Sequence, residues 1–469
     1  MTLPKNEEGS GQLGWTSLKQ QLAARPAVAV LFGLVVGLTL RQHPGHIFFL
    51  LAGLWFVDDR RFRVSLGLSF LLGAVLTPQL APRLEASSYR REVVEVVSVP
   101  RVGPDGVTFN AKSSSMGYRF FLPHGPVADR LIVGDRLQFG GVVRPLRPET
   151  EMNFRVQGVS GRVVPDRVAV VGEGTWLART AKSASLMFSG RMNAWLPREP
   201  ANFMNALVLG SQDLLPEKTA ESLRATGTFH VVAASGMQVT AFASIIALLV
   251  RRLPVPRGFR FGLIAAVLIL YTLVAGASVA VVRAAIMFLV AYGAFFYRRE
   301  RDFLSSWCIA GIAILLWQPS AIFQIGAQLS FIVMLFLGLF GGIGESDLPW
   351  KNLLRSSWVG FWASSPLTAY YFGFVPGLAL LANLLIASAI TVLFFAGLGL
   401  AAIGSVFPGV SAWAAPWLLG NPLRWIEWVT TSLGSDPRLQ FPVPAFSGYL
   451  LFIYYGAILW FWRPVKREA

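Results

Sequence analysis

The feature of this sequence that most constrains its fold is a set of long apolar stretches that carry almost no charge. Between residues 261 and 297 the only charged side chain is that of Arg283, and residues 304–344 and 373–420 carry none. A helix needs about 20 mostly apolar residues to cross the hydrocarbon core of a bilayer. These stretches predict an α-helical polytopic membrane protein with about 12 spans, and they exclude a soluble enzyme.

Positive charge is the second constraint. The formal net charge is +16, and 14% of the residues are charged, against about 25% in soluble proteins. Such a surplus would suit nucleic acid as a partner, but most Arg and Lys residues lie at the ends of apolar stretches. Basic clusters of this kind occur at residues 60–63, 251–260, 298–301, 351–355 and 463–467. Because short basic loops mark the cytoplasmic side of a membrane, we interpret the surplus mainly as a signal of orientation.

The changes between apolar and polar stretches divide the chain into parts with different predicted roles. In chain order these are a cytoplasmic N-terminal segment (1–25), N-terminal membrane helices (26–80), a small extracytoplasmic β domain (89–172), amphipathic and re-entrant helices (175–229), a membrane channel domain (230–462) and a cytoplasmic tail (463–469). Counting spans between the basic clusters places both termini inside a cytoplasmic (inner) membrane and the β domain outside it.

The β domain is predicted from short stretches of alternating polarity. Glu92-Val-Val-Glu-Val-Val and Tyr118-Arg-Phe-Phe-Leu are typical of strands, and Val133-Gly134-Asp135-Arg136 is a turn signal before another strand. About five short strands in about 80 residues predict a small β-barrel or sandwich. The helix expected next, at residues 175–196, has charged positions opposite apolar ones and is predicted to lie along the membrane surface.

One predicted span, at residues 410–433, is interrupted by Arg424 and Glu427. Their i, i+3 spacing places them next to each other on one helix face, where the two charges can pair. Without this span the basic C-terminal tail would fall outside, so the predicted orientation depends on it.

Arg283 is the sharpest physical anomaly, because a charge deep in a span costs roughly 2.5 to 3.5 kcal/mol on insertion scales. Such residues usually face the interior of a helix bundle or a watery path. One interpretation is a structural arginine that caps helix carbonyls or pairs with an acid. The other is a functional cation, which suits a channel for an anionic polymer.

A second unusual stretch is His230-Val-Val-Ala-Ala-Ser235-Gly236-Met-Gln238, which is polar for a membrane span. Small residues permit close helix approach or a local break in the helix. His230 and Ser235 are five positions apart and do not share a helix face, and no nearby acid would orient the histidine. We therefore expect these residues to line a pore or make structural hydrogen bonds, with no catalytic role.

No metal, cofactor or motor is predicted. His43 and His46 are close in sequence, but no paired carboxylate accompanies them. A phosphate-binding glycine loop of the ATPase type is absent from the sequence. The chain is not expected to be an enzyme.

A family resemblance is carried by a set of motifs in residues 205–403. They are Asn205-Ala-Leu-Val-Leu-Gly210, Leu223-Arg224-Ala-Thr-Gly-Thr-Phe-His230 continuing through Ser235-Gly236-Met-Gln238, Val282-Arg283-Ala-Ala-Ile-Met287, Ile325-Gly-Ala-Gln328-Leu-Ser330-Phe331, Ser365-Pro-Leu-Thr-Ala-Tyr-Tyr-Phe372 and Leu381-Ala-Asn383-Leu384. In this order and spacing the set resembles the ComEC competence family. The β domain is similar to the soluble domain of that family, which resembles an OB-fold.

The resemblance implies a channel that passes single-stranded DNA across the cytoplasmic membrane in natural transformation. The candidate residues of the substrate path are Arg224, His230, Ser235, Gly236, Gln238, Arg283, Gln328, Ser330 and Asn383. Membrane lipids, a separate nuclease, a DNA receptor, an ATP-driven motor and a second copy of the chain are the expected partners.

Two departures from the family pattern keep other functions open. Gln238 stands where the family often has a second histidine, and the sequence has no His-x-His-x-Asp-His motif of a metallo-β-lactamase-like nuclease. Either another polypeptide supplies that nuclease, or this chain does not import DNA in the usual way. The alternatives are a transporter for another anionic or lipid-linked substrate and a membrane scaffold that conducts nothing.

Overall fold

The computed structural model describes residues 25–39, 59–77, 81–102, 105–114, 116–147, 151, 154–155, 157–211, 214–232, 236–296, 302–340, 349–434 and 440–461. The chain forms two compact units. One comprises Met1–Gln79 with Leu289–Gln324, and the other comprises Leu80–Phe288 with Ile325–Ala469.

The first unit is built on close helix packing. It contains helices α2 (Pro26–Thr39), α4 (Arg60–Leu76), α13 (Phe303–Trp317) and η4 (Pro319–Phe323). A Cβ at Gly73 of α4 would lie 2.6 Å from the Leu34 carbonyl oxygen of α2, so glycine allows the two backbones to touch. Asp302 caps α13 through the Ser305 N–H and also pairs with Arg25 at 2.7 Å.

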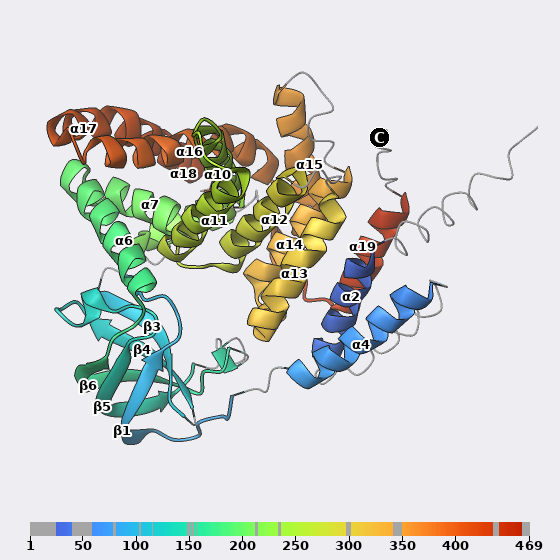
Figure 1. Ribbon diagram of the computed structural model, residues 1–469, viewed down its shortest axis with the longest axis horizontal. Coiled ribbons are helices and arrows are strands. Elements are labelled where there is room, and N and C mark those ends of the chain that lie inside the picture. The colour runs from blue at the N-terminus through green and yellow to red at the C-terminus, as the bar shows by residue number, and fades with distance from the viewer. Residues whose placement is uncertain are drawn as a thin grey trace, which may run out of the picture. The chain divides into compact units, whose positions relative to one another are not determined.

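The second unit begins with a closed β-barrel (Figure 1). Its strands are β1 (Ser88–Val96), β2 (Arg101–Val102), β3 (Gly106–Lys112), β4 (Gly117–Pro123), β5 (Arg136–Pro145) and β6 (Gly161–Gly172). The hydrogen-bonded order is β1-β5-β6-β4-β3, and a β1–β3 pairing closes the ring, while β2 extends β3. The β4–β6 pair is parallel and the other pairs are antiparallel. The predicted small β domain is confirmed, as a barrel rather than a sandwich.

Aromatic rings fill the barrel. Phe109 stacks on Phe120 with a centroid distance of 5.2 Å, and Phe139 meets Phe120 edge to face at 5.0 Å. Tyr118 is buried as well, and its hydroxyl donates a hydrogen bond to Glu92. Because alternate positions of each strand point inward, the period-2 pattern in the sequence builds this core.

The predicted Gly-Asp turn closes one end of the barrel. Gly134 has a φ of +91°, which favours glycine, and the buried Asp135 carboxylate follows it. That carboxylate accepts hydrogen bonds from the N–H groups of Ile132, at 2.9 Å, and Gly174, at 2.8 Å. Asp135 therefore joins the barrel to the segment that leads into the next helix.

Helices make up most of the rest of the second unit. They are α6 (Trp176–Trp195), α7 (Arg198–Leu209), α8 (Glu217–Ala225), α9 (Phe229–Val232), α10 (Gly236–Arg251), α11 (Arg257–Val274), α12 (Val279–Phe296, of which residues 289–296 belong to the first unit), α14 (Ile325–Phe340), α15 (Pro349–Phe372), α16 (Ala379–Ile403), α17 (Pro408–Ala415), η5 (Pro416–Gly420), α18 (Asn421–Gly434) and α19 (Tyr449–Phe461). Two short strands, β7 (Phe374–Pro376) and β8 (Gln440–Pro442), pair with each other. The predicted helix at 175–196 is confirmed as α6, which Thr175 caps by accepting from the Ala178 N–H.

The prediction of about 12 spans is not confirmed. Among the described residues, only α11 and α16 are long and apolar enough to cross a membrane. The shorter apolar helices are Pro26–Thr39, Gln238–Arg251, Val279–Ala294, Phe303–Trp317, Ile325–Phe340 and Tyr449–Ile458. At about 1.5 Å per residue, helices of this length fall short of a hydrocarbon core of about 30 Å.

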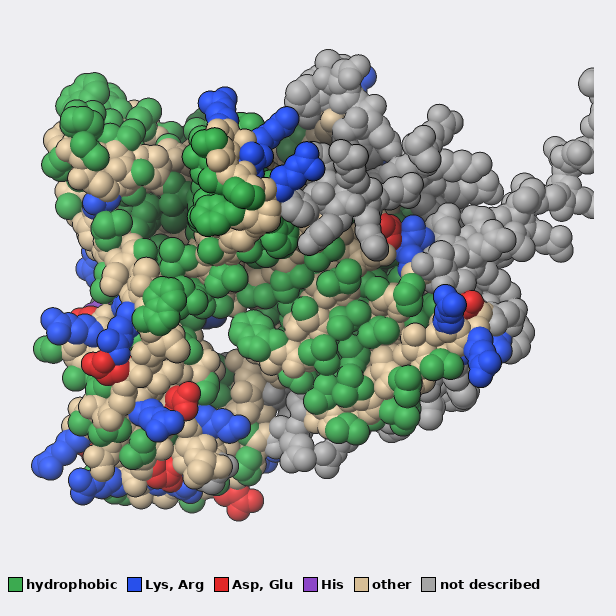
Figure 2. Space-filling view, viewed as in Figure 1, with side chains coloured by type: hydrophobic (Ala, Val, Ile, Leu, Met, Phe, Trp, Pro, Cys, Tyr) green, Lys and Arg blue, Asp and Glu red, His purple; other side chains and the backbone are tan. Residues whose placement is uncertain are grey.

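The helices nevertheless present apolar side chains outward. Phe259 and Ile269 of α11, Val392 of α16 and Trp413 of α17 are all exposed. Figure 2 shows hydrophobic side chains over much of the described helical surface. Exposed apolar area on this scale is uncommon on soluble proteins and is consistent with a membrane location.

The predicted span at 410–433 corresponds to α17, η5 and α18, in which a π-helical turn begins at Pro416. The expected pairing of Arg424 with Glu427 is wrong, since Arg424 donates to the side chain of Asn421 instead. Asn421 is also three positions away on the helix, and a short polar side chain there competes for the guanidinium.

Candidate functional site around Arg283

Arg283 lies in the apolar helix α12 and is only 5% exposed. Within the described residues, no carboxylate lies within ion-pairing distance of its guanidinium, and Nε and Nη1 are buried without a hydrogen-bond partner. A buried charge left without a partner is strongly destabilising. The part of the chain that the structure describes therefore gives no structural reason for a charge at this position.

The first helical residue of α10 makes room for the guanidinium. A Cβ at Gly236 would lie 2.9 Å from Nη2 of Arg283 and 3.3 Å from the Cβ of Ala284. On another side, the guanidinium carbon lies 5.7 Å from the ring centroid of Phe331 in α14, within the range of a cation–π contact. Two predicted site residues, Gly236 and Arg283, are thus brought together.

A sharp turn lies just before the predicted span at 230–250. Gly227 has a φ of +71°, and a Cβ there would lie 2.7 Å from Cγ of Pro376. The buried hydroxyls of Thr226 and Thr228 are 2.8 Å apart. Helix α9 ends at Val232 and α10 begins at Gly236, and residues 233–235 between them lie outside the described residues. Whether the small residues there break the helix or permit close helix approach therefore stays a prediction.

Gln328 lies one turn before Phe331 on α14, and an i, i+3 pair shares a helix face. Its Oε1 accepts a hydrogen bond of 2.8 Å from the Tyr371 hydroxyl of α15. Tyr371 is 37% exposed, and its ring meets that of Tyr370 at 5.0 Å. A line of polar and aromatic groups therefore runs along α14 from the buried Arg283 to a more accessible tyrosine pair.

The other predicted residues take part in different contacts. Asn383 of α16 donates to the Ser357 hydroxyl of α15 at 2.9 Å, and the exposed Arg224 lies 4.9 Å from the ring centroid of Phe229. Gln238 is buried, and Ser330 is partly buried. Arg224 is thus no buried pore charge in this structure.

Two predicted residues lie partly or wholly outside the part of the chain that the structure describes. His230 belongs to α9, but its side chain lies outside the described residues, as does the whole of Ser235. Their predicted place in the path stays a prediction.

The structure adds Phe331 and Tyr371 to the site, and it gives Asn383 a separate partner, Ser357. Phe331 and Tyr371 belong to sequence motifs, but an aromatic residue in a membrane segment gives no signal that separates a site from a core. Ser357 has no sequence signal, because its partner Asn383 is far along the chain. Within the described residues, no group of three His, Cys, Asp or Glu side chains is placed to hold a metal ion.

A closed β-barrel followed by apolar helices, with a buried arginine that has no acidic partner among the described residues, is consistent with the class of membrane-associated proteins. Comparison with known proteins narrows that class. The model of the family described as "Competence protein" matches residues 207–467, more than half of the chain. The chain belongs to this family.

Two curated relatives support the assignment. Competence protein ComA of Neisseria gonorrhoeae is 29% identical over 401 residues, which is 77% of this chain and 54% of that protein. ComE operon protein 3 of Bacillus subtilis (strain 168) is 26% identical over 181 residues, 38% of this chain and 23% of that protein. The match thus covers about half the length of the first relative and about a quarter of the length of the second. No solved structure matches. The resemblance identified from the motifs is confirmed at the level of the family.

Proposed function

We propose that this chain forms the path by which single-stranded DNA crosses the cytoplasmic membrane in natural transformation. The observation that carries the proposal is the buried guanidinium of Arg283, two of whose nitrogens have no partner among the described residues. Membership of the competence family supports DNA as the anion, because competence is the state in which cells take up DNA.

The chemistry of the site suits a passing phosphate chain. Single-stranded DNA carries one negative charge per nucleotide, and a guanidinium binds a phosphate through two parallel hydrogen bonds. Phe331 and the Tyr370–Tyr371 pair supply aromatic faces, and base–aromatic stacking tolerates any sequence. These features describe a path that holds the strand without reading its bases.

The barrel is proposed to be an OB-type module on the outer side of the membrane. The barrel is a closed ring of five strands, and its parallel pair is β4 with β6, the third and fifth ring strands in chain order. This is the arrangement expected of an OB-fold. Its large rings, Phe109, Tyr118, Phe120 and Phe139, are buried in the core and are not available to stack on bases. The module would therefore guide the strand through backbone contacts.

The membrane arrangement proposed with this function has about 12 spans, both termini inside and the barrel outside. The basic clusters at residues 251–260, 298–301, 351–355 and 463–467 support it. A separate nuclease, a DNA receptor and an ATP-driven motor remain proposed partners. No enzymatic step is proposed for this chain.

Deletion of the gene in a competent host, followed by transformation with marked DNA, tests the proposal. We expect transformants to be lost and to return when the full chain is supplied in trans. Unchanged transformation in the deletion strain would overturn the proposal. Loss of transformation with full uptake of labelled strand into the cytoplasm would instead favour a scaffold.

A transporter for another anionic or lipid-linked substrate is the second candidate. The observation that favours it is that one guanidinium binds any phosphate and does not by itself select DNA. Binding of a lipid-linked sugar phosphate to the purified protein, with no binding of an oligonucleotide, would select this candidate.

A further inference from the structure

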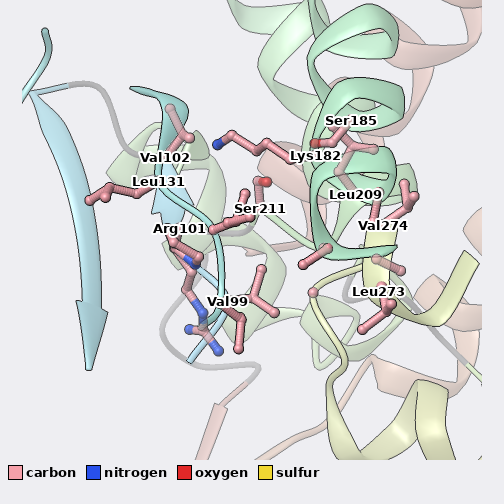
Figure 3. A pocket seen from close by; sticks show the side chains of 18 of the residues that line it. Val99, Arg101, Val102, Leu131, Lys182, Ser185, Leu209, Ser211, Leu273 and Val274 are labelled. Carbon is pink, nitrogen blue, oxygen red and sulfur yellow. The ribbon is translucent and has the colours of Figure 1, made fainter. Parts of the chain in front are cut away.

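A cavity of about 120 Å³ lies in the second unit between the barrel and the helices, and Arg283 is not among its lining residues (Figure 3). Barrel residues 99–102 and 131–133 form one side. The first half of α6, the end of α7 and the turn between α11 and α12 form the other. The cavity therefore belongs to the junction at which the barrel meets the helical part of this unit.

Lys182 is the cation of this cavity. It shares one face of α6 with Ala178, Ala181 and Ser185, which also line the cavity. Figure 3 shows its amine reaching from α6 toward Val102 and Leu131, whereas the Arg101 guanidinium extends in another direction. In the described part of the chain, no carboxylate lies within 4.0 Å of the Lys182 amine.

The surroundings of Lys182 leave its charge largely uncompensated. Burial lowers the pKa of Lys182, and Asp129 acts in the opposite direction from a longer distance. The Asp129 carboxylate is itself engaged by the His124 ring, at 2.9 Å, and by the Gly125 N–H, at 3.2 Å. An anion beside the amine would restore the balance of charge.

The helix ends around the cavity are compatible with an anion. The last carbonyls of α11 accept hydrogen bonds from the N–H groups of residues 275–277. Ser278, which lines the cavity, stands directly before α12 and receives the Val281 N–H at 3.5 Å. The capped C-terminal end of α11 and the positive N-terminal end of α12 thus both border the cavity.

The walls indicate the rest of the ligand. They include the aliphatic side chains of Val99, Val102, Leu131, Ile132 and Leu273 beside the polar Ser185, Ser211 and Ser278, and no described lining residue is aromatic. A nucleotide base would find no stacking face here, whereas methylene groups would find an apolar one.

The level of the cavity indicates where the ligand comes from. Val274, one of its lining residues, ends α11, which is one of the two described helices able to cross a membrane. The cavity therefore lies at the end of a candidate span, which in the membrane arrangement proposed above is the level of the bilayer surface. Trp176, at the start of α6, is 76% exposed, and tryptophan is enriched at that level of a membrane.

We propose that this cavity binds the headgroup phosphate of an anionic phospholipid, with Lys182 as its cation and the aliphatic walls against the glycerol and the first methylenes. The bound lipid fixes the barrel against the membrane surface. This role is independent of which substrate passes Arg283.

The test uses the full chain purified in detergent and titrated with phosphatidylglycerol, with phosphatidylcholine, with inorganic phosphate and with an oligonucleotide. We expect phosphatidylglycerol to bind and to raise the thermal unfolding temperature, and Lys182→Gln to weaken that binding roughly fivefold, as expected for the loss of one lysine at an anionic surface. Lys182→Arg, which keeps the charge, retains binding. Lys218→Gln, at an exposed lysine of α8, is the matched control and changes nothing.

The outcomes separate the possible ligands. Equal binding of phosphatidylglycerol by the wild type and Lys182→Gln would overturn the proposal. Inorganic phosphate that protects as well as the lipid would also overturn it, by pointing to a site for free phosphate. Loss of oligonucleotide binding in Lys182→Gln, with lipid binding intact, would assign the cavity to the strand instead.

Discussion

Arg283 shows how one residue can indicate function when it conflicts with its surroundings. An apolar helix that encloses a cation with no described acid beside it is less stable than the same helix with an apolar residue there. The anomaly is visible in the sequence, because Arg283 is the one charge between residues 261 and 297. The neighbours of Arg283 could not be identified from the sequence, because Gly236 and Phe331 contact it from distant parts of the chain.

Gly236 is predicted to control the position of that guanidinium. In Gly236→Ala the new Cβ would crowd Nη2 at 2.9 Å, and the flexible arginine would move while the fold survives. We expect transformation to fall about tenfold at an unchanged protein level, since misplacement of a binding group by about 1 Å is costly. Gly262→Ala in α11, where a Cβ meets nothing within 4 Å, is the control. Equal transformation by both variants would contradict the prediction.

The Tyr371 hydroxyl and Gln328 are predicted to act as a pair. Tyr371→Phe and Gln328→Ala each remove the same hydrogen bond, so the double variant should lose little more DNA uptake than either single variant. Each single loss is expected to be a few-fold, the scale of one hydrogen bond at about 1 kcal/mol. Uptake of labelled strand measures all three variants. Fully additive losses would show that the two residues act separately.

At the scale of elements, sequence patterns predicted the strands and turns that depend on residues close together in the chain. The alternation around Glu92 and Tyr118 and the turn at Gly134-Asp135 follow from local chemistry, and both are present. Closure of the barrel through β1 and β3 is a long-range pairing that no local pattern specifies. Arg424 likewise donates to Asn421 and not to Glu427. Both partners are three positions away along the helix, so spacing alone could not predict which of them Arg424 would contact.

Asp135 is predicted to hold the barrel to α6. Asp135→Ala leaves the N–H groups of Ile132 and Gly174 without their acceptor, at a cost of roughly 1 to 3 kcal/mol for each group that stays buried. Asp135→Asn keeps one acceptor oxygen and should cost less. Hydrogen exchange at these two amides measures the effect, and unchanged protection in Asp135→Ala would contradict it.

Asp302 is predicted to stabilise the first unit in two ways. Although burial acts against it, the hydrogen bonds from Arg25 and Ser305 lower the pKa of Asp302. A lowered pKa means that the carboxylate stabilises the fold above its unfolded pKa, and that this contribution is lost as pH falls through the folded value.

Substitutions at Asp302 separate its two roles. Asp302→Asn keeps an N-cap acceptor and loses the charge, whereas Asp302→Ala loses both and should cost about 1 kcal/mol more. Thermal unfolding of the purified variants at neutral pH measures the difference. Equal unfolding temperatures for the two variants would show that the cap contributes nothing.

At the scale of the whole molecule, family membership and a membrane location follow from patterns spread over the chain. The motifs that carried the resemblance lie inside or beside residues 207–467, which the family model matches. The number of membrane spans cannot be derived from such sequence patterns. Hydropathy reports where apolar segments lie, but α13 and α14 are shorter than a bilayer is thick, and only packing and tilt decide how such helices cross.

The central claim is that Arg283 binds the phosphates of a strand in transit, and transformation by Arg283 variants tests it most directly. Arg283→Ala and Arg283→Lys should be expressed in the deletion strain beside Arg198→Ala, which changes an exposed arginine of α7. Labelled DNA bound at the cell surface should be counted separately from strand that reaches the cytoplasm. We predict normal surface binding in every strain and, in Arg283→Ala, at least about a tenfold loss of internal strand, the scale of one strong charge-assisted contact. Arg283→Lys should lie between, and Arg198→Ala should match the wild type. Wild-type delivery of strand by Arg283→Ala would contradict the account.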